Sequence, residues 1–200
     1  MIMNMKLSRK DLYSLEEYSE LRDDFRARVM QHKKNRRLDL GDNLVLFFED
    51  RLVMHYQVQE MLKAEKIFDA DGIQEELDAY NPLIPDGTNW KATMMIQYAD
   101  VAERQHMLEK LVGIEDMIWV QVAGHDKVYP IADEDLERAT EDKTSAVHFL
   151  RFELTPTMIA DLHKGANIAA GVEHENYSVT IDAIPANVAS SLTEDLESIQ

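Results

Sequence analysis

The chain has 200 residues, of which 45% are hydrophobic, and it carries a formal net charge of −17. A chain of this length can bury one sizeable core. Its negative charge disfavours binding to DNA and to anionic membrane surfaces. The absence of cysteine excludes disulfides, thiol nucleophiles and cysteine-ligated metal centres. Because the sequence has no run of eighteen apolar residues and no basic segment followed by an apolar region, we expect neither a membrane span nor a secretory signal.

The charge is distributed unevenly along the chain. Between Arg22 and Arg37, seven basic residues stand against two acidic ones, so that this stretch carries +5 and the remainder carries −22. Such a separation favours self-association, and a homo-oligomer is one expected state. The basic run over residues 33–37 has no aromatic residues interleaved with it. It therefore suits the solvated end of a helix better than a nucleic-acid site.

Residues 1–85 are predicted to form a helical arm, a short strand and a helix pair. Ser14-Leu-Glu-Glu17 has the spacing of a capping box, in which each of the two end side chains satisfies a free backbone donor, and it opens a long helix. Residues 44–48 are rich in strand formers, and a second helix follows them. A third helix must stop before Pro82, and the proline-rich connector that begins there is the predicted domain boundary.

Residues 86–200 show one strand–helix–strand–strand pattern twice. In each copy an alternating strand leads into a capped helix, a glycine closes the helix, and two further strands flank a short turn. In the first copy the alternating strand covers residues 90–98, the helix follows Asp100 and the turn lies at 124–126. In the second copy the strand covers residues 146–154, the helix follows Thr155 and the turn lies at 175–176. We predict an α+β fold in which the copies form a largely antiparallel sheet, within one compact unit.

An acidic segment separates the two copies. Residues 133–143 hold six acidic residues against two basic ones, and we expect a solvated loop there. His148 follows on the strand side that also carries Ala146 and Leu150. A hydrogen-bonded core histidine is therefore the preferred interpretation of His148.

Glu60 is the carboxylate that most favours a functional site. It lies on the second helix beside a mixed polar and apolar surface, and a partly buried glutamate usually pairs with an arginine or a tyrosine. Arg51, Tyr80 and Arg104 are the candidate partners, and with Gln57 they complete the predicted ligand-binding set. One interpretation is an ion pair that fixes how the helices dock. The other is a general acid or base with a raised pKa, in a cleft between the helical arm and the sheet.

Metal ligation has one candidate pair. Glu103 and His106 are three residues apart, so on a helix both can address one divalent ion if a third ligand joins them. A di-iron centre needs two such pairs, and no other glutamate in the chain is followed at this spacing by a histidine. The alternative is two solvated side chains on a surface helix, and we expect no bound cofactor.

Five sequence blocks carry a resemblance that spans nearly the whole chain: Ser14-Leu-Glu-Glu-Tyr18, Phe25-Arg-Ala-Arg-Val29, Gln57-Val-Gln-Glu-Met61, Tyr80-Asn-Pro-Leu-Ile-Pro85, and Lys143-Thr-Ser-Ala-Val147 with Leu150-Arg-Phe152. In order and spacing they resemble a bacterial family that is catalogued only as a domain of unknown function. Genes of that family often neighbour those of rubrerythrin-like proteins and iron–sulfur oxidoreductases. The resemblance therefore implies a cytoplasmic role linked to redox or peroxide metabolism, and it implies no catalytic residue.

Three functions follow from these observations, in order of preference. The first is an accessory or interaction protein that docks a redox protein, which the charge asymmetry, the missing catalytic motifs and the implied gene context favour. The second is a metal-binding or small-ligand-binding enzyme with its site around Glu60. The third is RNA binding through residues 33–37.

Overall fold

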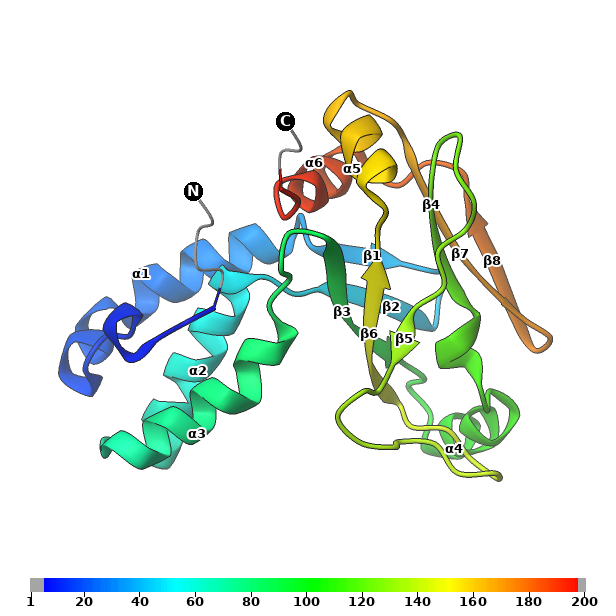
Figure 1. The fold of residues 1–200 in the computed structure, drawn as a ribbon. Helices are drawn as coiled ribbons and strands as arrows, with labels where there is room; N and C mark the ends of the chain where they lie inside the picture. Colours follow the sequence, from blue (N-terminus) through cyan, green and yellow to red (C-terminus); the bar gives the residue numbers. More distant parts are fainter. Residues whose placement is uncertain (1–5, 198–200) are drawn as a thin grey trace. The chain divides into compact units, whose positions relative to one another are not determined.

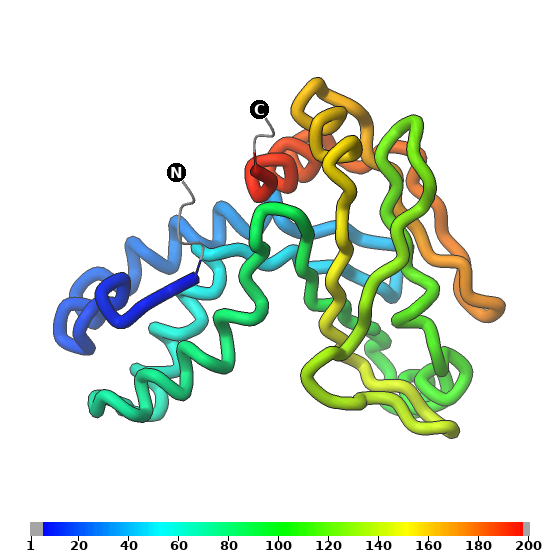
Figure 2. The backbone as a smooth tube through the Cα atoms, viewed as in Figure 1, coloured from blue at the N-terminus to red at the C-terminus, as the bar shows by residue number. Residues whose placement is uncertain are grey.

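A computed structural model of the chain describes residues 6–197; residues 1–5 and 198–200 lie outside this description. The chain forms two compact units, which we call unit 1 (Met1–Asn35 and Glu49–Asp86) and unit 2 (Arg36–Phe48 and Gly87–Gln200). Figure 1 shows helices alone in unit 1 and sheets with helices in unit 2, and Figure 2 traces the backbone of both units. The predicted α+β class is confirmed. No helix within residues 6–197 is both long and apolar enough to cross a membrane.

In the described part of unit 1, the three α-helices each begin after a residue whose side chain caps the helix N-terminus. The predicted capping box is present: the Ser14 hydroxyl accepts a hydrogen bond from the Glu17 backbone N–H, and the Glu17 carboxylate accepts one from the Ser14 backbone N–H. Asp50 caps the next helix by accepting from the Val53 backbone N–H at 2.8 Å. The elements are η1 (Arg9–Asp11), α1 (Leu15–Lys33), α2 (Arg51–Glu65), α3 (Ala70–Tyr80) and η2 (Asn81–Leu83).

Helix α2 organises the core of unit 1, because it packs against both α1 and α3. One side of α2 buries Val58 and Leu62 against Leu77 of α3. Another side faces the aromatic residues of α1, where Tyr18 and Phe25 are buried. Apolar residues on α2 therefore have partners on two sides, which accounts for its high content of buried positions.

Unit 2 holds two antiparallel sheets. The five-stranded sheet has the order β1 (Arg37–Asp39), β2 (Leu44–Phe48), β3 (Asn89–Ile96), β6 (Val147–Glu153), β5 (Ile131–Ala132). The three-stranded sheet has the order β4 (Ile118–Val122), β7 (Ile168–His174), β8 (Tyr177–Ile181). The helical elements of this unit are α4 (Val101–Lys110), η3 (Ile114–Met117), α5 (Pro156–His163) and α6 (Ala186–Thr193).

The order of the elements confirms the predicted repeat, and the way in which the two copies pair their strands produces two sheets. Strand β3 of the first copy pairs with β6 of the second, and β4 pairs with β7, so each copy contributes to both sheets. The single sheet expected from the sequence is therefore divided. The predicted hairpin around residues 124–126 is also reduced to one bridge between Val120 and Val128, because β5 leaves to pair with β6.

The two sheets and their helices share one core. The buried cluster contains Leu46 and Phe152 from the five-stranded sheet, Ile118 and Val172 from the three-stranded sheet, and residues from all three helices. Trp90 is fully buried within it, and its indole N–H donates to the carbonyl of Leu192 at 2.8 Å. This bond satisfies the one polar atom that burial of the indole would otherwise leave unpaired.

Arg36 corrects the expectation that residues 33–37 form a solvated helix end. It lies after α1, only 1% exposed, and its guanidinium donates to the carbonyls of Phe48 and Ser191 and to the Asp195 carboxylate, the last at 2.6 Å. Burying a charge is unfavourable unless it is paired and hydrogen-bonded, and here these contacts provide both. The neighbouring Arg37 behaves differently, because it forms an exposed pair with Asp39.

Replacing Arg36 by methionine is expected to lower the free energy of unfolding by about 3 kcal/mol, because the Asp195 carboxylate loses its buried partner. The matched change Arg37→Met removes only an exposed ion pair and should cost less than about 1 kcal/mol. Urea unfolding of both variants measures the difference. Equal effects at the two positions would contradict the role assigned to Arg36.

Candidate functional site

Glu60 lies on α2 and pairs with two residues of α1. Its carboxylate accepts a hydrogen bond from the Tyr18 hydroxyl at 2.6 Å and two from the Arg22 guanidinium, both at 2.8 Å. The hydrogen bonds from Arg22 are the main reason why the pKa of Glu60 is lowered to about 2, against the opposing effect of burial. This direction is opposite to the raised pKa that a general acid requires. At neutral pH Glu60 is ionised and holds α1 against α2.

The other predicted ligand-binding residues have separate surroundings. Arg51 donates to Asp11 at 2.6 Å, and Tyr80 packs beside the buried cluster between α2 and α3. Gln57 is half-buried on α2. Arg104 belongs to unit 2, where its guanidinium donates to the carbonyl of Tyr98 at 3.2 Å. The partners of Glu60 are thus of the predicted types, an arginine and a tyrosine, but they come from α1.

The candidate metal ligands lie on the exposed surface of α4. Both Glu103 and His106 are exposed, and the backbone N–H of Glu103 donates to the capping carboxylate of Asp100. Across residues 6–197, the structure contains no group of three or more histidine, aspartate or glutamate residues placed to hold a metal ion. Glu103 and His106 therefore have no third ligand in the described part of the chain.

His148 anchors the start of the acidic segment to the core. It is fully buried, with Nδ1 2.6 Å from the Asp133 carboxylate and Nε2 2.8 Å from the Thr144 hydroxyl, which is the hydrogen-bonded core histidine that the sequence predicts. Asp133 also accepts from the Phe149 backbone N–H. The acidic segment is thus tied to β6 at its first residue and is exposed over most of its length.

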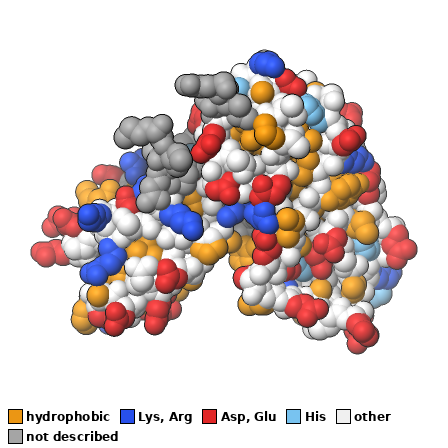
Figure 3. All heavy atoms as spheres, in the orientation of Figure 1, with side chains coloured by type: hydrophobic (Ala, Val, Ile, Leu, Met, Phe, Trp, Pro, Cys, Tyr) orange, Lys and Arg blue, Asp and Glu red, His pale blue; other side chains and the backbone are white. Residues whose placement is uncertain are grey.

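The acidic segment carries apolar side chains on an acidic surface. Ile131 on the edge strand β5 and Leu136 in the segment are 46% and 56% exposed. Glu134 pairs with Arg151 and Asp135 with Arg138, whereas Glu137 is exposed. Unit 2 as a whole holds 22 acidic residues against 10 basic ones, a net charge of −12. In Figure 3 acidic side chains are spread over the visible surface of this part of the chain, with hydrophobic atoms between them.

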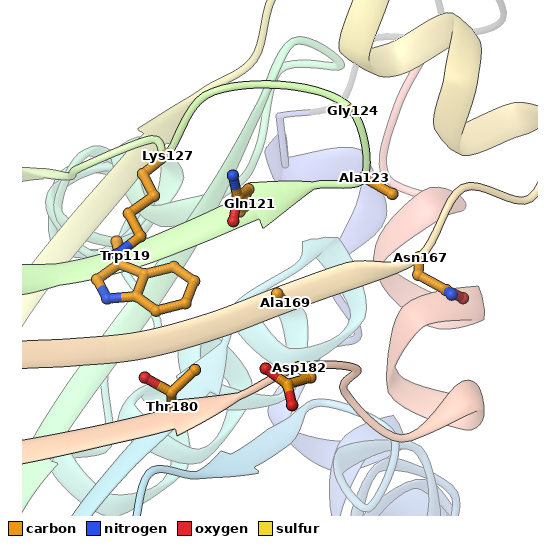
Figure 4. A pocket seen from close by; sticks show the side chains of 9 residues that line it. All are labelled: Trp119, Gln121, Ala123, Gly124, Lys127, Asn167, Ala169, Thr180 and Asp182. Atoms are coloured by element: carbon orange, nitrogen blue, oxygen red, sulfur yellow. The ribbon is translucent and has the colours of Figure 1, made fainter.

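A hollow of about 380 Å³ lies on the outer face of the three-stranded sheet, opposite the face that carries Ile118, Val120 and Val122. The register places Trp119, Gly171 and Thr180 in one row across the sheet. The next row carries Gln121 and Ala169. At Ala169 and Gly171 the central strand β7 contributes only small residues to this face, so space remains above that part of the strand. The hollow is lined by Trp119, Gln121, Ala123, Gly124, Lys127, Asn167, Ala169, Thr180 and Asp182 (Figure 4).

The indole of Trp119 forms one end of the hollow and is held on both faces. A Cβ atom at Gly171 would come within 2.5 Å of the ring, so the indole lies directly on the glycine backbone. The Lys127 ammonium lies 4.1 Å from the ring centroid on the other side and is hydrogen-bonded to Glu173. This bond from Lys127 is the main cause of the lowered pKa of Glu173. Figure 4 shows the six-membered ring of Trp119 extending towards the hollow, while Asn167 and Asp182 lie towards the other end.

The sequence patterns did not lead to a prediction of this hollow, although one signal for it is present. The alternation of β4 and β8 places polar residues on the outward face, and Ala169 and Gly171 are the small outward residues of β7. Small residues at alternate positions of a central strand indicate space or close approach on that face. The pairing of β4 with β7 is needed to bring the polar residues together.

The structure defines an α+β protein with a duplicated strand–helix–strand–strand unit. The chain belongs to the family described as "Protein of unknown function (DUF3501)", whose model matches residues 6–196. This confirms the family resemblance seen in the sequence. A crystal structure of a novel protein of unknown function from Burkholderia pseudomallei K96243 is 51% identical, covers 96% of this chain and 100% of its own, and has a TM-score of 0.91. The sequence matches no curated protein.

Replacing Glu60 by glutamine tests the ion pair with Arg22. Because the folded pKa is depressed, the pair contributes stability above about pH 4.5 and loses it as the pH falls towards about 2. We expect a cost of about 1 kcal/mol at neutral pH, after allowance for the partial exposure of both side chains. The difference from the unmodified protein should shrink as the pH falls through this range.

Urea unfolding at several pH values measures this difference. The matched variant Glu65→Gln, at an exposed position of the same helix, should change the unfolding free energy by less than about 0.5 kcal/mol. A difference for Glu60→Gln that does not vary with pH would show that the charge of Glu60 is not the source of the stability.

Proposed function

We propose that this protein is a cytoplasmic accessory protein that docks a partner of redox or oxidative-stress metabolism through the acidic surface of unit 2. The partner is a protein with a basic surface around an apolar contact. The observation that carries this proposal is the pair of exposed apolar side chains, Ile131 and Leu136, at the edge of a sheet and within an acidic segment.

Charge supports a basic partner. The net charge of −12 on unit 2 creates a field that accelerates encounter with a positively charged surface and disfavours acidic competitors. Within the segment, Glu137, Glu141 and Asp142 are exposed. These three carboxylates remain available for a basic rim on the partner.

The exposed apolar side chains of Ile131 and Leu136 support a docking contact at the acidic segment. Interfaces gain most of their affinity from a few apolar anchors that become desolvated, and their charged rims set partner choice and encounter rate. Ile131 and Leu136 can serve as such anchors. Their base is held in position, because Asp133 between them is bonded to His148 and to the backbone of Phe149.

The redox association rests on the gene neighbourhood that the family resemblance implies. Rubrerythrin-like and iron–sulfur proteins are the partners that this neighbourhood favours. An accessory role needs neither a metal nor a nucleophile in this chain, which agrees with its lack of cysteine. The docking residues belong to unit 2, whereas Glu60 belongs to unit 1 and pairs with Arg22, so this proposal assigns Glu60 no part in docking.

A double variant, Ile131→Ser with Leu136→Ser, is expected to lower recovery of the partner from native lysate at least tenfold, equivalent to about 1.4 kcal/mol of binding free energy. The matched control is Val101→Ser on α4, since Val101 is also 56% exposed. Recovery is quantified by mass spectrometry after capture on the tagged protein. Retention should also weaken as the salt concentration rises.

Two results would contradict the docking proposal. One is equal recovery by the double variant and by Val101→Ser. The other is capture that contains neither a rubrerythrin-like nor an iron–sulfur protein. Sedimentation of the purified protein provides a further check, because concentration-dependent self-association that the double variant abolishes would assign the surface to a second copy of this chain.

A further inference from the structure

The hollow on the outer face of β4, β7 and β8 has the size of a small-ligand site. Its volume of about 380 Å³ falls within the range of about 300–1,000 Å³ that ligand pockets occupy. It lies wholly within unit 2, and the apolar pair Ile131 and Leu136 does not line it. A function of the hollow is therefore independent of the docking proposed above.

Stacking ligands do not suit this hollow. Binding of a sugar ring or a nucleobase commonly uses an open aromatic face. Both faces of the Trp119 indole are occupied, one by Gly171 and the other by the Lys127 ammonium. The indole, which is only 2% exposed, therefore offers a ligand no open face, and its six-membered ring borders the hollow (Figure 4).

Several polar groups that line the hollow can accept hydrogen bonds from a ligand, whereas the buried indole N–H of Trp119 lies on the side of the ring away from Gln121 and Asp182 (Figure 4). The Gln121 side-chain NH2 donates to the carbonyl of His125 at 2.8 Å, so the oxygen of this amide remains for a ligand. The Lys127 ammonium is already engaged by Glu173. Asp182 has an exposed carboxylate that makes no ion pair or hydrogen bond with residues 6–197. Thr180 adds a hydroxyl to the same outward face.

An acceptor-rich hollow with one uncompensated carboxylate selects a cation that carries several N–H donors. Guanidinium provides five such donors in a planar fork that matches a carboxylate. A bare divalent ion fits less well, because among residues 6–197 the lining includes one acidic side chain, Asp182, and no histidine. The negative charge of unit 2 further concentrates cations near the site.

We propose that this hollow binds a guanidinium group, with Asp182 as its counter-ion and with Gln121 and Thr180 as additional acceptors. The alkyl chain attached to the guanidinium lies over Ala169 and against the edge of Trp119. The guanidinium belongs either to free arginine or to an arginine side chain of a polypeptide, and both sources present the same chemistry to these residues.

Titration of the full chain with free L-arginine and with the tripeptide Gly-Arg-Gly tests the proposal and distinguishes the two sources. Proton–nitrogen NMR follows the indole N–H of Trp119 and the side-chain amides of Gln121 and Asn167. Titration up to about 10 mM ligand is sufficient to measure a dissociation constant of about 1 mM. Citrulline is the control ligand, since it is a neutral analogue of arginine with nearly the same shape. Trp90, which lies in the core, provides an internal reference.

We expect saturable shifts with at least one guanidinium ligand and none with citrulline. Asp182→Asn should weaken binding at least tenfold without changing the melting temperature, because the carboxylate makes no contact that supports the fold. The matched variant Asp126→Asn, at an exposed carboxylate of the neighbouring loop that does not line the hollow, should bind as the unmodified protein does. Saturation by free arginine assigns a small molecule, and saturation by the tripeptide alone assigns a polypeptide.

Three results would overturn the proposal: no saturable shift with either guanidinium ligand, an equal response to citrulline, or equal affinities of the Asp182→Asn and Asp126→Asn variants. None of these results bears on docking through Ile131 and Leu136, which is read out separately by capture of a protein partner.

Discussion

The buried charge of Arg36 is the constraint on which the arrangement of unit 2 depends. Its guanidinium joins the end of β2 to two residues at the C-terminal end of α6, and the Trp90 indole bonds to the same stretch from β3. Helix α6 is thereby fixed against the five-stranded sheet. Because α6 follows β8 after a short connection that contains Asp182, these contacts also help to set the edge of the hollow on the three-stranded sheet.

Charged residues have different roles in the two units. In unit 1 the opposite charges of Glu60 and Arg22 meet between α1 and α2, and the lowered pKa of Glu60 shows that this pair favours the ionised carboxylate. In unit 2 an excess of negative charge remains on the surface. Paired charges inside a helix bundle fix packing, whereas unpaired charges at a surface favour encounter with a cationic partner.

The two proposed binding features of unit 2 rest on rigid supports. The acidic segment starts at Asp133, which a fully buried histidine and a β6 backbone N–H hold in place. The hollow has a floor made by paired strands and an end made by an indole confined on both faces. Groups held in this way lose little conformational freedom on binding, which favours affinity for a matching ligand.

Local interactions within the sequence determined the elements of this protein and their order. The capping box at Ser14, the cap at Thr155 and the alternating strands of both copies act over a few residues, so their patterns are visible without a fold. Only the tertiary structure decided which strands pair, that Arg36 is buried, that Arg22 is the partner of Glu60, and that Trp119 and Asp182 line one hollow. Each of these outcomes depends on contacts between residues far apart in the chain, where burial and charge pairing override local preference.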